Sequence, residues 1–253
     1  MKRVMRVQWF EMQKYIGYKL LLLGGGAFIL TLVYEVMRAD YMEPVVAYYV
    51  LEIFRLFMFI QVLIMDLTLN LDNRNGVVMQ DLLAGVNRKQ LLNGKVIFGN
   101  CVALILEIVY TLFAVIIVAV TCGIMIEEMR SLLIRFFLLL LLHFRVAGEV
   151  ILASVLIKKP FVVSIVYTVA FLMTRHNEME LQGTWISEVS VNSLLDSISS
   201  YQVKTVYATE GGIIDVLQYL PTTKEIMIAS MGSILIGGIC FLIAVRIYEK
   251  REY

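Results

Sequence analysis

The sequence has few of the residues that a water-soluble domain needs on its surface. Only 17% of its 253 residues are charged, whereas 60% are hydrophobic, and the mean hydropathy is +0.80. A chain of this composition has too little polar surface to cover a soluble fold. We therefore expect most of it to lie in a lipid bilayer.

Residues and motifs that would indicate catalysis or nucleotide binding are also scarce. The chain has two histidines, and its three cysteines lie in apolar runs without metal-binding spacing. No G-x-x-x-x-G-K-[ST] motif occurs, so the loop that cradles nucleotide phosphates is missing. The net charge of +1 gives no indication of nucleic-acid binding. We expect no catalytic residue, metal site, cofactor or nucleic-acid partner for this chain.

Six apolar segments approach the length of about 20 residues that a helix needs to cross the bilayer core. They are residues 20–37, 45–65, 96–126, 132–157, 161–174 and 226–246. The fifth is short, and the third and fourth are long enough to tilt. The predicted fold is an all-α polytopic membrane protein, with residues 1–253 forming a single transmembrane domain. Its first five spans lie within residues 20–173.

The distribution of Lys and Arg predicts the orientation of these spans. With six spans both termini share one side of the membrane, and that side carries 14 of the 22 Lys and Arg residues. The opposite side carries six, among them Arg130 and Arg135. Because cytoplasmic loops are enriched in Lys and Arg, we expect both termini to be cytoplasmic.

Residues 1–19 have the pattern of a helix that lies on the membrane surface. Met5, Trp9, Met12 and Ile16 recur at helical spacing among charged residues. A first span that simply begins early is the alternative. The aromatic residues that suit the headgroup region, and that we expect to act as surface anchors, are Trp9, Tyr15 and Tyr18.

Residues 174–223 form a long segment on the opposite side, with two apolar patterns at helical spacing. The first comprises Val191, Leu194, Leu195 and Ile198, and the second Ile213, Ile214, Leu217 and Leu220. Gly211-Gly212 separates the two sets and Pro221 ends the second. We expect two short extracellular helices before the sixth span, facing the outer leaflet or dipping into it.

The polar connector of residues 72–95, between the second and third spans, is the most informative part of the chain. The apolar residues Val78, Leu82, Leu83 and Val86 share one helical face. Asn75-Gly76 suits a turn before this face, Gly85 suits a break after it, and cationic residues follow. This pattern predicts a short surface helix that docks in a cleft on a soluble partner and passes its movement to two spans.

The connector resembles the coupling region of ABC-2-type transporter permeases, in particular small bacterial ones associated with peptide export and antimicrobial-peptide immunity. The family pattern is roughly an acidic residue, Asn-Gly, an apolar pair, Gly-x-Ser/Thr-Arg, and a Lys that opens the next helix. The matching positions are Asp72, Asn75-Gly76, Leu82-Leu83, Gly85-Val86-Asn87-Arg88 and Lys95. Asn87 replaces the usual hydroxyl residue, and Val77-Val78 stands where Thr and Ile often occur. The layout of the whole chain, including the basic tail, is similar to that of the family.

The resemblance implies the permease subunit of an ATP-driven exporter in the bacterial plasma membrane, which moves an amphipathic substrate such as a peptide by alternating access. It implies two copies of a separate ABC ATPase subunit, which bind ATP and Mg²⁺, and a second copy of this chain or a related permease. The residues implied to couple to the ATPase are Asn75, Gly76, Val78, Leu82, Leu83, Gly85, Arg88, Lys89 and Lys95. An ordinary cytoplasmic loop of some other six-span protein is the alternative.

Ionisable residues within the spans are candidates for function, because an unpaired charge in the bilayer costs several kcal/mol. They are Glu52, Arg55, Glu107, His143, Arg145 and Glu149. They either line a polar pathway or form ion pairs that hold helices or subunits together. Arg145 and Glu149 are four residues apart, so they can pair within one helix.

Two other classes of protein remain as alternatives. Glu127-Glu128 is similar to the paired glutamates of CAAX-type membrane proteases, but Leu132 stands where that pattern requires Arg. A membrane sensor or immunity subunit would bind an extracellular peptide with the amphipathic segment of residues 174–223 and transport nothing. The sequence leaves open the identity of the substrate and whether two identical or two related permeases assemble.

Overall fold

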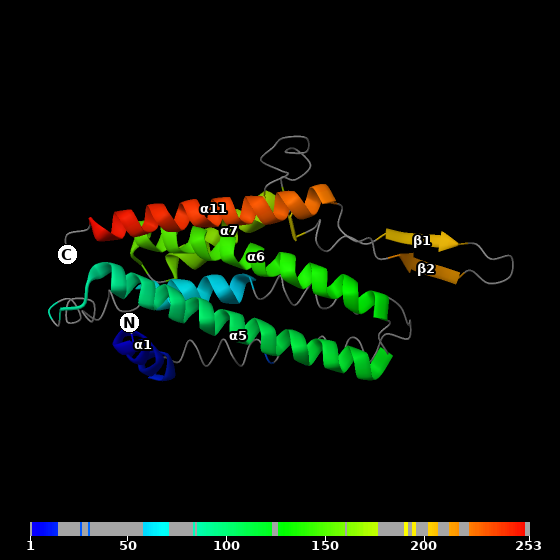
Figure 1. Ribbon diagram of the computed structural model, residues 1–253, viewed down its shortest axis with the longest axis horizontal. Coiled ribbons are helices and arrows are strands. Elements are labelled where there is room, and N and C mark those ends of the chain that lie inside the picture. The colour runs from blue at the N-terminus through cyan, green and yellow to red at the C-terminus, as the bar shows by residue number, and fades with distance from the viewer. Residues whose placement is uncertain are drawn as a thin grey trace.

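The computed structural model describes residues 2–14, 26, 30, 58–70, 83, 85–122, 126–159, 161–176, 190–191, 194–195, 202–206, 213–217 and 223–250. Helix dominates these residues (Figure 1). The helices are α1 (Lys2–Lys14), Met58–Asn70, α5 (Arg88–Cys122), α6 (Ile126–Ile157), α7 (Val162–His176) and α11 (Thr223–Glu249). The strands are β1 (Gln202–Val206) and β2 (Ile213–Leu217).

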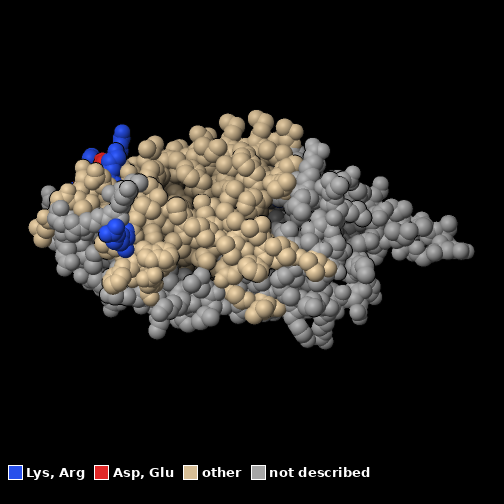
Figure 2. Space-filling view, turned by 60° about the horizontal axis from the view of Figure 1, so that its bottom comes forward, with Lys and Arg blue, Asp and Glu red and all other residues tan. Residues whose placement is uncertain are grey.

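The long helices α5, α6 and α11 run nearly along the longest axis of the molecule (Figure 1). Helix α5 leads away from the end at which both termini lie, α6 returns to that end, and α11 runs in the same direction as α6. Lys and Arg gather at this end (Figure 2). We call it the basic end and define it by Arg88, Lys89, Lys158, Lys159, Arg246 and Lys250.

Among the described residues, three helices are long and apolar enough to cross a membrane, and they coincide with the third, fourth and sixth predicted spans. They are Arg88–Phe113, Leu133–Ile157 and Ile226–Glu249. Met58–Asn70 and Val162–Phe171 are shorter apolar helices, at the places of the second and fifth spans. Residues 45–57 lie outside the described residues, and of residues 20–37 the structure describes only Gly26 and Leu30, both helical. The chain thus has the character of a membrane protein, and the count of six spans stays a prediction.

Helix α6 forms the centre of the described bundle. In its apolar window 56% of the residues are buried, against 33% in α5 and 17% in α11. Its buried residues pack with the Met58–Asn70 helix, α7 and α11 in one apolar core. The outer faces of α5 and α11 instead expose large apolar side chains, including Ile105, Leu112, Phe113, Met231, Ile234 and Leu242. Such continuous apolar surfaces are typical of helices that contact lipid or another membrane subunit.

The contact between α6 and α11 depends on two glycines that meet at the crossing. A methyl group added at Gly237 of α11 would lie 2.8 Å from the Cα atom of Arg145, and one added at Gly148 of α6 would collide with the Gly237 backbone. Small residues allow helix backbones to approach closely in a membrane, where no water drives the association. The neighbouring Gly238 has nothing within 4 Å of the same added atom.

The surface helix at the N-terminus is present over Lys2–Lys14, and it packs on the protein through residues outside the apolar set that contains Trp9. Val4 is 1% exposed and packs on Leu91 and on Gly94 of α5, and Gln8, one turn later, is also buried. Trp9 and Phe10 are about half exposed, as a membrane-surface anchor requires. Tyr15 and Tyr18 lie outside the described residues.

The prediction of the second extracellular helix is wrong. Ile213–Leu217 forms strand β2, which pairs antiparallel with β1 so that Thr205 lies opposite Ile214. Both segments are rich in β-branched residues, which fit a paired strand better than a helix. A set of four apolar residues is too short to distinguish the periodicity of a helix from that of a strand.

Burial corrects one further expectation, for Leu194 and Leu195, and shows that Arg135 lies inside the protein, whereas the side of the membrane on which Arg135 lies stays a prediction. Leu194 and Leu195 are helical as predicted, but they are 2% and 3% exposed and pack into the apolar core instead of facing a leaflet. Arg135, which we counted with the external residues, is only 1% exposed. It shares a helical face with the buried Leu138 and Leu142, because α6 begins nine residues earlier, at Ile126.

Replacement of Gly237 by alanine is expected to lower the free energy of unfolding by about 1–3 kcal/mol, since the backbones of α6 and α11 must separate. Gly238→Ala is the matched control and should leave stability unchanged or slightly higher, because alanine favours helix. The midpoint of thermal unfolding in detergent measures both variants. Equal midpoints for the two variants would contradict close packing at Gly237.

Candidate functional site

The exit of the connector lies at the basic end, and the turn that the sequence predicts at Gly85 is present. Val86, which the sequence places on the apolar docking face, instead packs partly buried against Val4 and Leu91. Leu83 is helical and 84% exposed, and Gly85 has a φ of +83°, a left-handed conformation that glycine adopts without strain. The backbone N–H of Lys89 donates to Asn87 Oδ1 at 3.1 Å, so Asn87 caps the first turn of α5. Asn75, Gly76, Val78 and Leu82 lie outside the described residues.

The first residues of α5 contact the end of α11. Arg88 donates from a guanidinium nitrogen to the backbone carbonyl of Glu249 at 3.4 Å, and Lys89 Nζ lies 3.8 Å from Glu249 Oε1. The exposed Lys89–Glu249 pair contributes little stability in water. These contacts join the exit of the connector to the C-terminal helix at one surface.

Among the predicted coupling residues that the structure describes, Lys95 is the buried one, with 1% of its surface exposed. Its Nζ donates at 3.4 Å to the backbone carbonyl of Leu69, in the last turn of the Met58–Asn70 helix. This bond joins α5 to the last described turn of the Met58–Asn70 helix. Lys95 therefore holds two helices together and does not present its charge to a partner.

Asp66 is a buried polar centre that the sequence analysis missed. It is 0% exposed, and its carboxylate accepts hydrogen bonds from Asn70 Nδ2 at 2.8 Å and from the backbone N–H and the hydroxyl of Ser164 at 3.0 and 2.8 Å. Ser164 lies in the first turn of α7, where free N–H groups and the helix dipole favour an anion. The four-residue spacing of Asp66 and Asn70 was the only signal in the sequence.

The remaining contacts of the Met58–Asn70 helix place it between α5, α6 and α7. The rings of Phe59 and Phe171 of α7 meet edge to face, 5.1 Å apart. A methyl group added at Gly99 of α5 would lie 2.7 Å from Met65 Sδ, so these two helices also approach closely. The helix runs antiparallel to α7, with an apolar contact at its start and the Asp66 carboxylate near its end.

Glu107 and His143, which the sequence places separately in two spans, form a buried pair. His143 Nδ1 lies 2.8 Å from Glu107 Oε2, with about 5% of each side chain exposed. Gln61 Nε2 donates to the backbone carbonyl of His143 at 2.8 Å, which adds a third helix to the cluster. Within the described part of the chain, His143 Nε2 and Gln61 Oε1 are buried without a hydrogen-bond partner.

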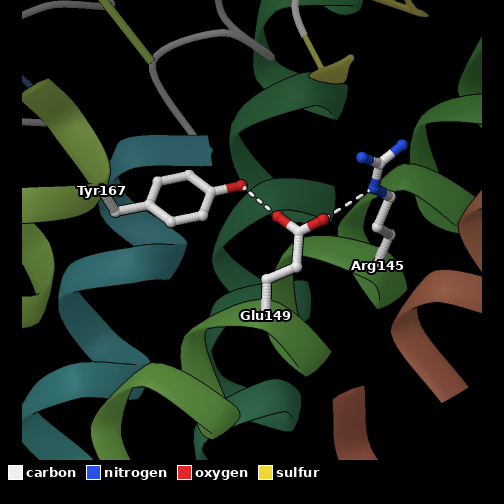
Figure 3. Close-up of polar contacts among 3 residues, drawn as sticks. All are labelled: Arg145, Glu149 and Tyr167. Carbon is white, nitrogen blue, oxygen red and sulfur yellow. Dashed lines mark hydrogen bonds and ion pairs between the residues drawn. The ribbon is translucent and has the colours of Figure 1, made fainter. Parts of the chain in front are cut away.

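Arg145 and Glu149 pair within α6, as their spacing predicts. Arg145 Nε donates to Glu149 Oε1 at 2.8 Å, and the hydroxyl of Tyr167 in α7 donates to Glu149 Oε2 at 3.0 Å. Figure 3 shows the guanidinium and the phenol approaching the carboxylate from opposite sides. Glu149 thus connects α6 with α7, and Arg145 lies at the crossing with α11.

The described residues include no group of three or more His, Cys, Asp or Glu side chains placed to hold a metal ion. Glu52 and Arg55 lie outside them. Comparisons of the chain with family models, with curated proteins and with solved structures found no match.

Replacement of Asn87 by alanine is expected to destabilise the first turn of α5 by about 1 kcal/mol, because the Lys89 amide loses its acceptor. Asn87→Ser should behave like the original chain, since a serine hydroxyl caps the same amide. Hydrogen exchange of the first-turn amides of α5, followed by mass spectrometry, measures the effect. Unchanged exchange in Asn87→Ala would show that the cap contributes nothing.

Reversal of one charge at a time, as Arg145→Glu or Glu149→Arg, is expected to lower the free energy of unfolding by about 3–5 kcal/mol, because like charges then meet in a partly buried site. The double reversal should recover at least half of this loss in thermal unfolding. A loss in the double variant equal to the sum of the two single losses would indicate that the residues do not act as a pair.

Proposed function

We propose that this chain is the permease subunit of a bacterial ATP-driven exporter of the ABC-2 type. It would move an amphipathic substrate, such as a peptide, out of the cell or the membrane by alternating access. The basic end would face the cytoplasm and bind a separate ATPase subunit, which would carry the ATP and Mg²⁺. Two copies of each subunit would form the complete transporter.

The observation that carries the proposal is the chemistry at the exit of the connector. Leu83 is a leucine with 84% of its surface exposed, and it lies at an end of the molecule where Arg88, Lys89 and other cations gather. An apolar side chain surrounded by charges on a polar surface is typical of a docking point for a soluble protein. The sequence of residues 72–95 adds the resemblance to coupling regions.

The connections of this exit support a role in passing on movement. On one side the connector joins α5, whose first turn is fixed by the left-handed Gly85 and the Asn87 cap. On the other side it joins the Met58–Asn70 helix, which contacts α5, α6 and α7. A partner that displaces the connector therefore acts on the centre of the bundle.

The apolar outer faces of α5 and α11 suit the other partners that the proposal requires. Their exposed residues include Ile105, Phe113, Ile234 and Leu242. These surfaces fit lipid around most of the subunit and a second permease subunit where two chains meet.

Exchange of Leu82 and Leu83 for aspartate is expected to release the ATPase subunit, because two charges replace the apolar side that docks. The measurement is co-purification in mild detergent from cells that express the chain together with its neighbouring ATPase gene, with ATPase activity assayed on the product. Gln13→Asp is the control, since it adds a charge at an exposed position of α1 outside the connector.

A Walker-motif subunit that co-purifies with the original chain and with Gln13→Asp, but not with the double aspartate variant, supports both the function and the docking point. If the chain purifies alone from cells that express the ATPase, the proposed function is contradicted. A membrane sensor of extracellular peptides would then be the better explanation of the amphipathic residues between α7 and α11.

A further inference from the structure

The last turn of the Met58–Asn70 helix leads directly into the connector, and polar contacts tie this turn to two other helices. Lys95 of α5 donates to the Leu69 carbonyl, and Ser164 of α7 donates twice to Asp66. A displacement of the connector must therefore act first on residues 66–70. The contacts of these residues decide which helices follow.

The contact with α7 is the stiffer of the two. The Asp66 carboxylate is completely buried and keeps three donors, at 2.8, 2.8 and 3.0 Å. A carboxylate that loses its donors in an apolar environment is strongly destabilised, whereas the bond from Lys95 Nζ to the Leu69 carbonyl is longer, at 3.4 Å, and its acceptor is uncharged. Asp66 and the first turn of α7 are thus bound to move together.

The α6–α7 turn adds to this stiffness at the basic end. Lys158 and Phe161, on either side of the turn, have φ values of 60° and 68°, a left-handed conformation that is strained for residues other than glycine. Such strain persists only where surrounding contacts hold the backbone. The hydrogen bonds of Asp66 to Ser164, three residues after Phe161, are contacts of this kind.

Helix α7 also reaches the intramembrane charges. Tyr167 follows Ser164 by three residues, about one turn, and donates to Glu149, which pairs with Arg145. A continuous series of hydrogen bonds and helical turns therefore runs from the connector to the crossing of α6 and α11. It passes through Asn70, Asp66, Ser164, Tyr167, Glu149 and Arg145.

We propose that Asp66 and Ser164 form the joint that passes movement of the connector to α7, which makes Asp66 a positioning residue of the transport cycle. This inference rests on the proposed permease function and names the helix on which the ATPase acts within the subunit. Spatial continuity alone does not establish coupling, so the decisive quantity is a movement of α7 that depends on nucleotide and on Asp66.

The experiment uses the complex with its ATPase subunit in lipid nanodiscs and spin labels at Val169→Cys in α7 and Leu242→Cys in α11. Both positions are exposed. The native Cys101, Cys122 and Cys240 are replaced by alanine. Distances between the labels are measured by pulsed electron resonance without nucleotide and after trapping with ATP and vanadate, and ATP hydrolysis is measured on the same samples.

The test variants are Asp66→Asn and Ser164→Ala. Ser154→Ala is the matched control, because Ser154 is a buried serine of α6 whose hydroxyl has no hydrogen-bond partner among the described residues. The original chain and Ser154→Ala should show a shift of the label distance on trapping. In Ser164→Ala the ratio of shifted to unshifted molecules should fall by about tenfold, the effect of one lost hydrogen bond to a charged group, with the ATPase still bound and hydrolysing. In Asp66→Asn the ratio of shifted to unshifted molecules should fall at least as far.

A purely structural role of the joint predicts lower thermal stability with an unchanged shift, and that result would overturn the inference while the permease function stands. A missing shift in the original chain, with the ATPase bound and active, would overturn it as well. If the original chain retains no ATPase, the proposed function fails and the inference fails with it. Should Asp66→Asn not fold, the comparison of Ser164→Ala with Ser154→Ala decides.

Discussion

The buried carboxylate of Asp66 is the constraint on which the arrangement of the short helices depends. An anion with no exposed surface must keep its donors, and these come from Asn70 and from the first turn of α7. The requirement fixes the Met58–Asn70 helix against α7 in both rotation and depth. Lys95 adds α5 by holding the Leu69 carbonyl of the same turn. Without these polar contacts, apolar surfaces of similar shape could pack in several registers.

The contact between the long helices α6 and α11 depends on shape and not on buried charge. Helices α6 and α11 meet through glycines and apolar side chains, and their crossing is determined by how closely two backbones can approach. The bundle therefore combines a contact defined by shape with joints defined by charge. Arg145, Glu149 and Tyr167 lie where these two kinds of contact come together, since Arg145 abuts Gly237 and Glu149 reaches α7.

The sequence predicted what depends on local patterns. Long apolar runs located α5, α6 and α11, helical spacing paired Arg145 with Glu149, and Gly85 marked the turn before α5. It could not predict that Glu107 meets His143 or that Asp66 meets Ser164, because 36 and 98 residues separate the partners and only the folded bundle brings them together. Strand β2 was misread as helix because its five residues are too few to define a period and its partner strand was not recognised.

Asn87 departs from the coupling pattern that the sequence analysis used, yet its side chain performs the same local task. Asn87 stands where a serine or threonine is usual, and its side chain caps the Lys89 amide. Asparagine, serine and threonine all perform this task at the start of a helix. The task of residue 87 in this chain is thus a contact with the backbone of α5.

The short length of α7 has a consequence for how the chain enters a membrane. Its 15 residues measure about 22 Å at 1.5 Å per residue, less than the bilayer core of about 30 Å. A helix this short leaves its ends or the surrounding lipid strained when it inserts alone. The tight turn after α6 and the bond from Tyr167 to Glu149 give it a partner that already spans the core. We therefore expect α6 and α7 to insert as a helical hairpin, so that insertion of the protein depends on the same contacts that hold it together afterwards.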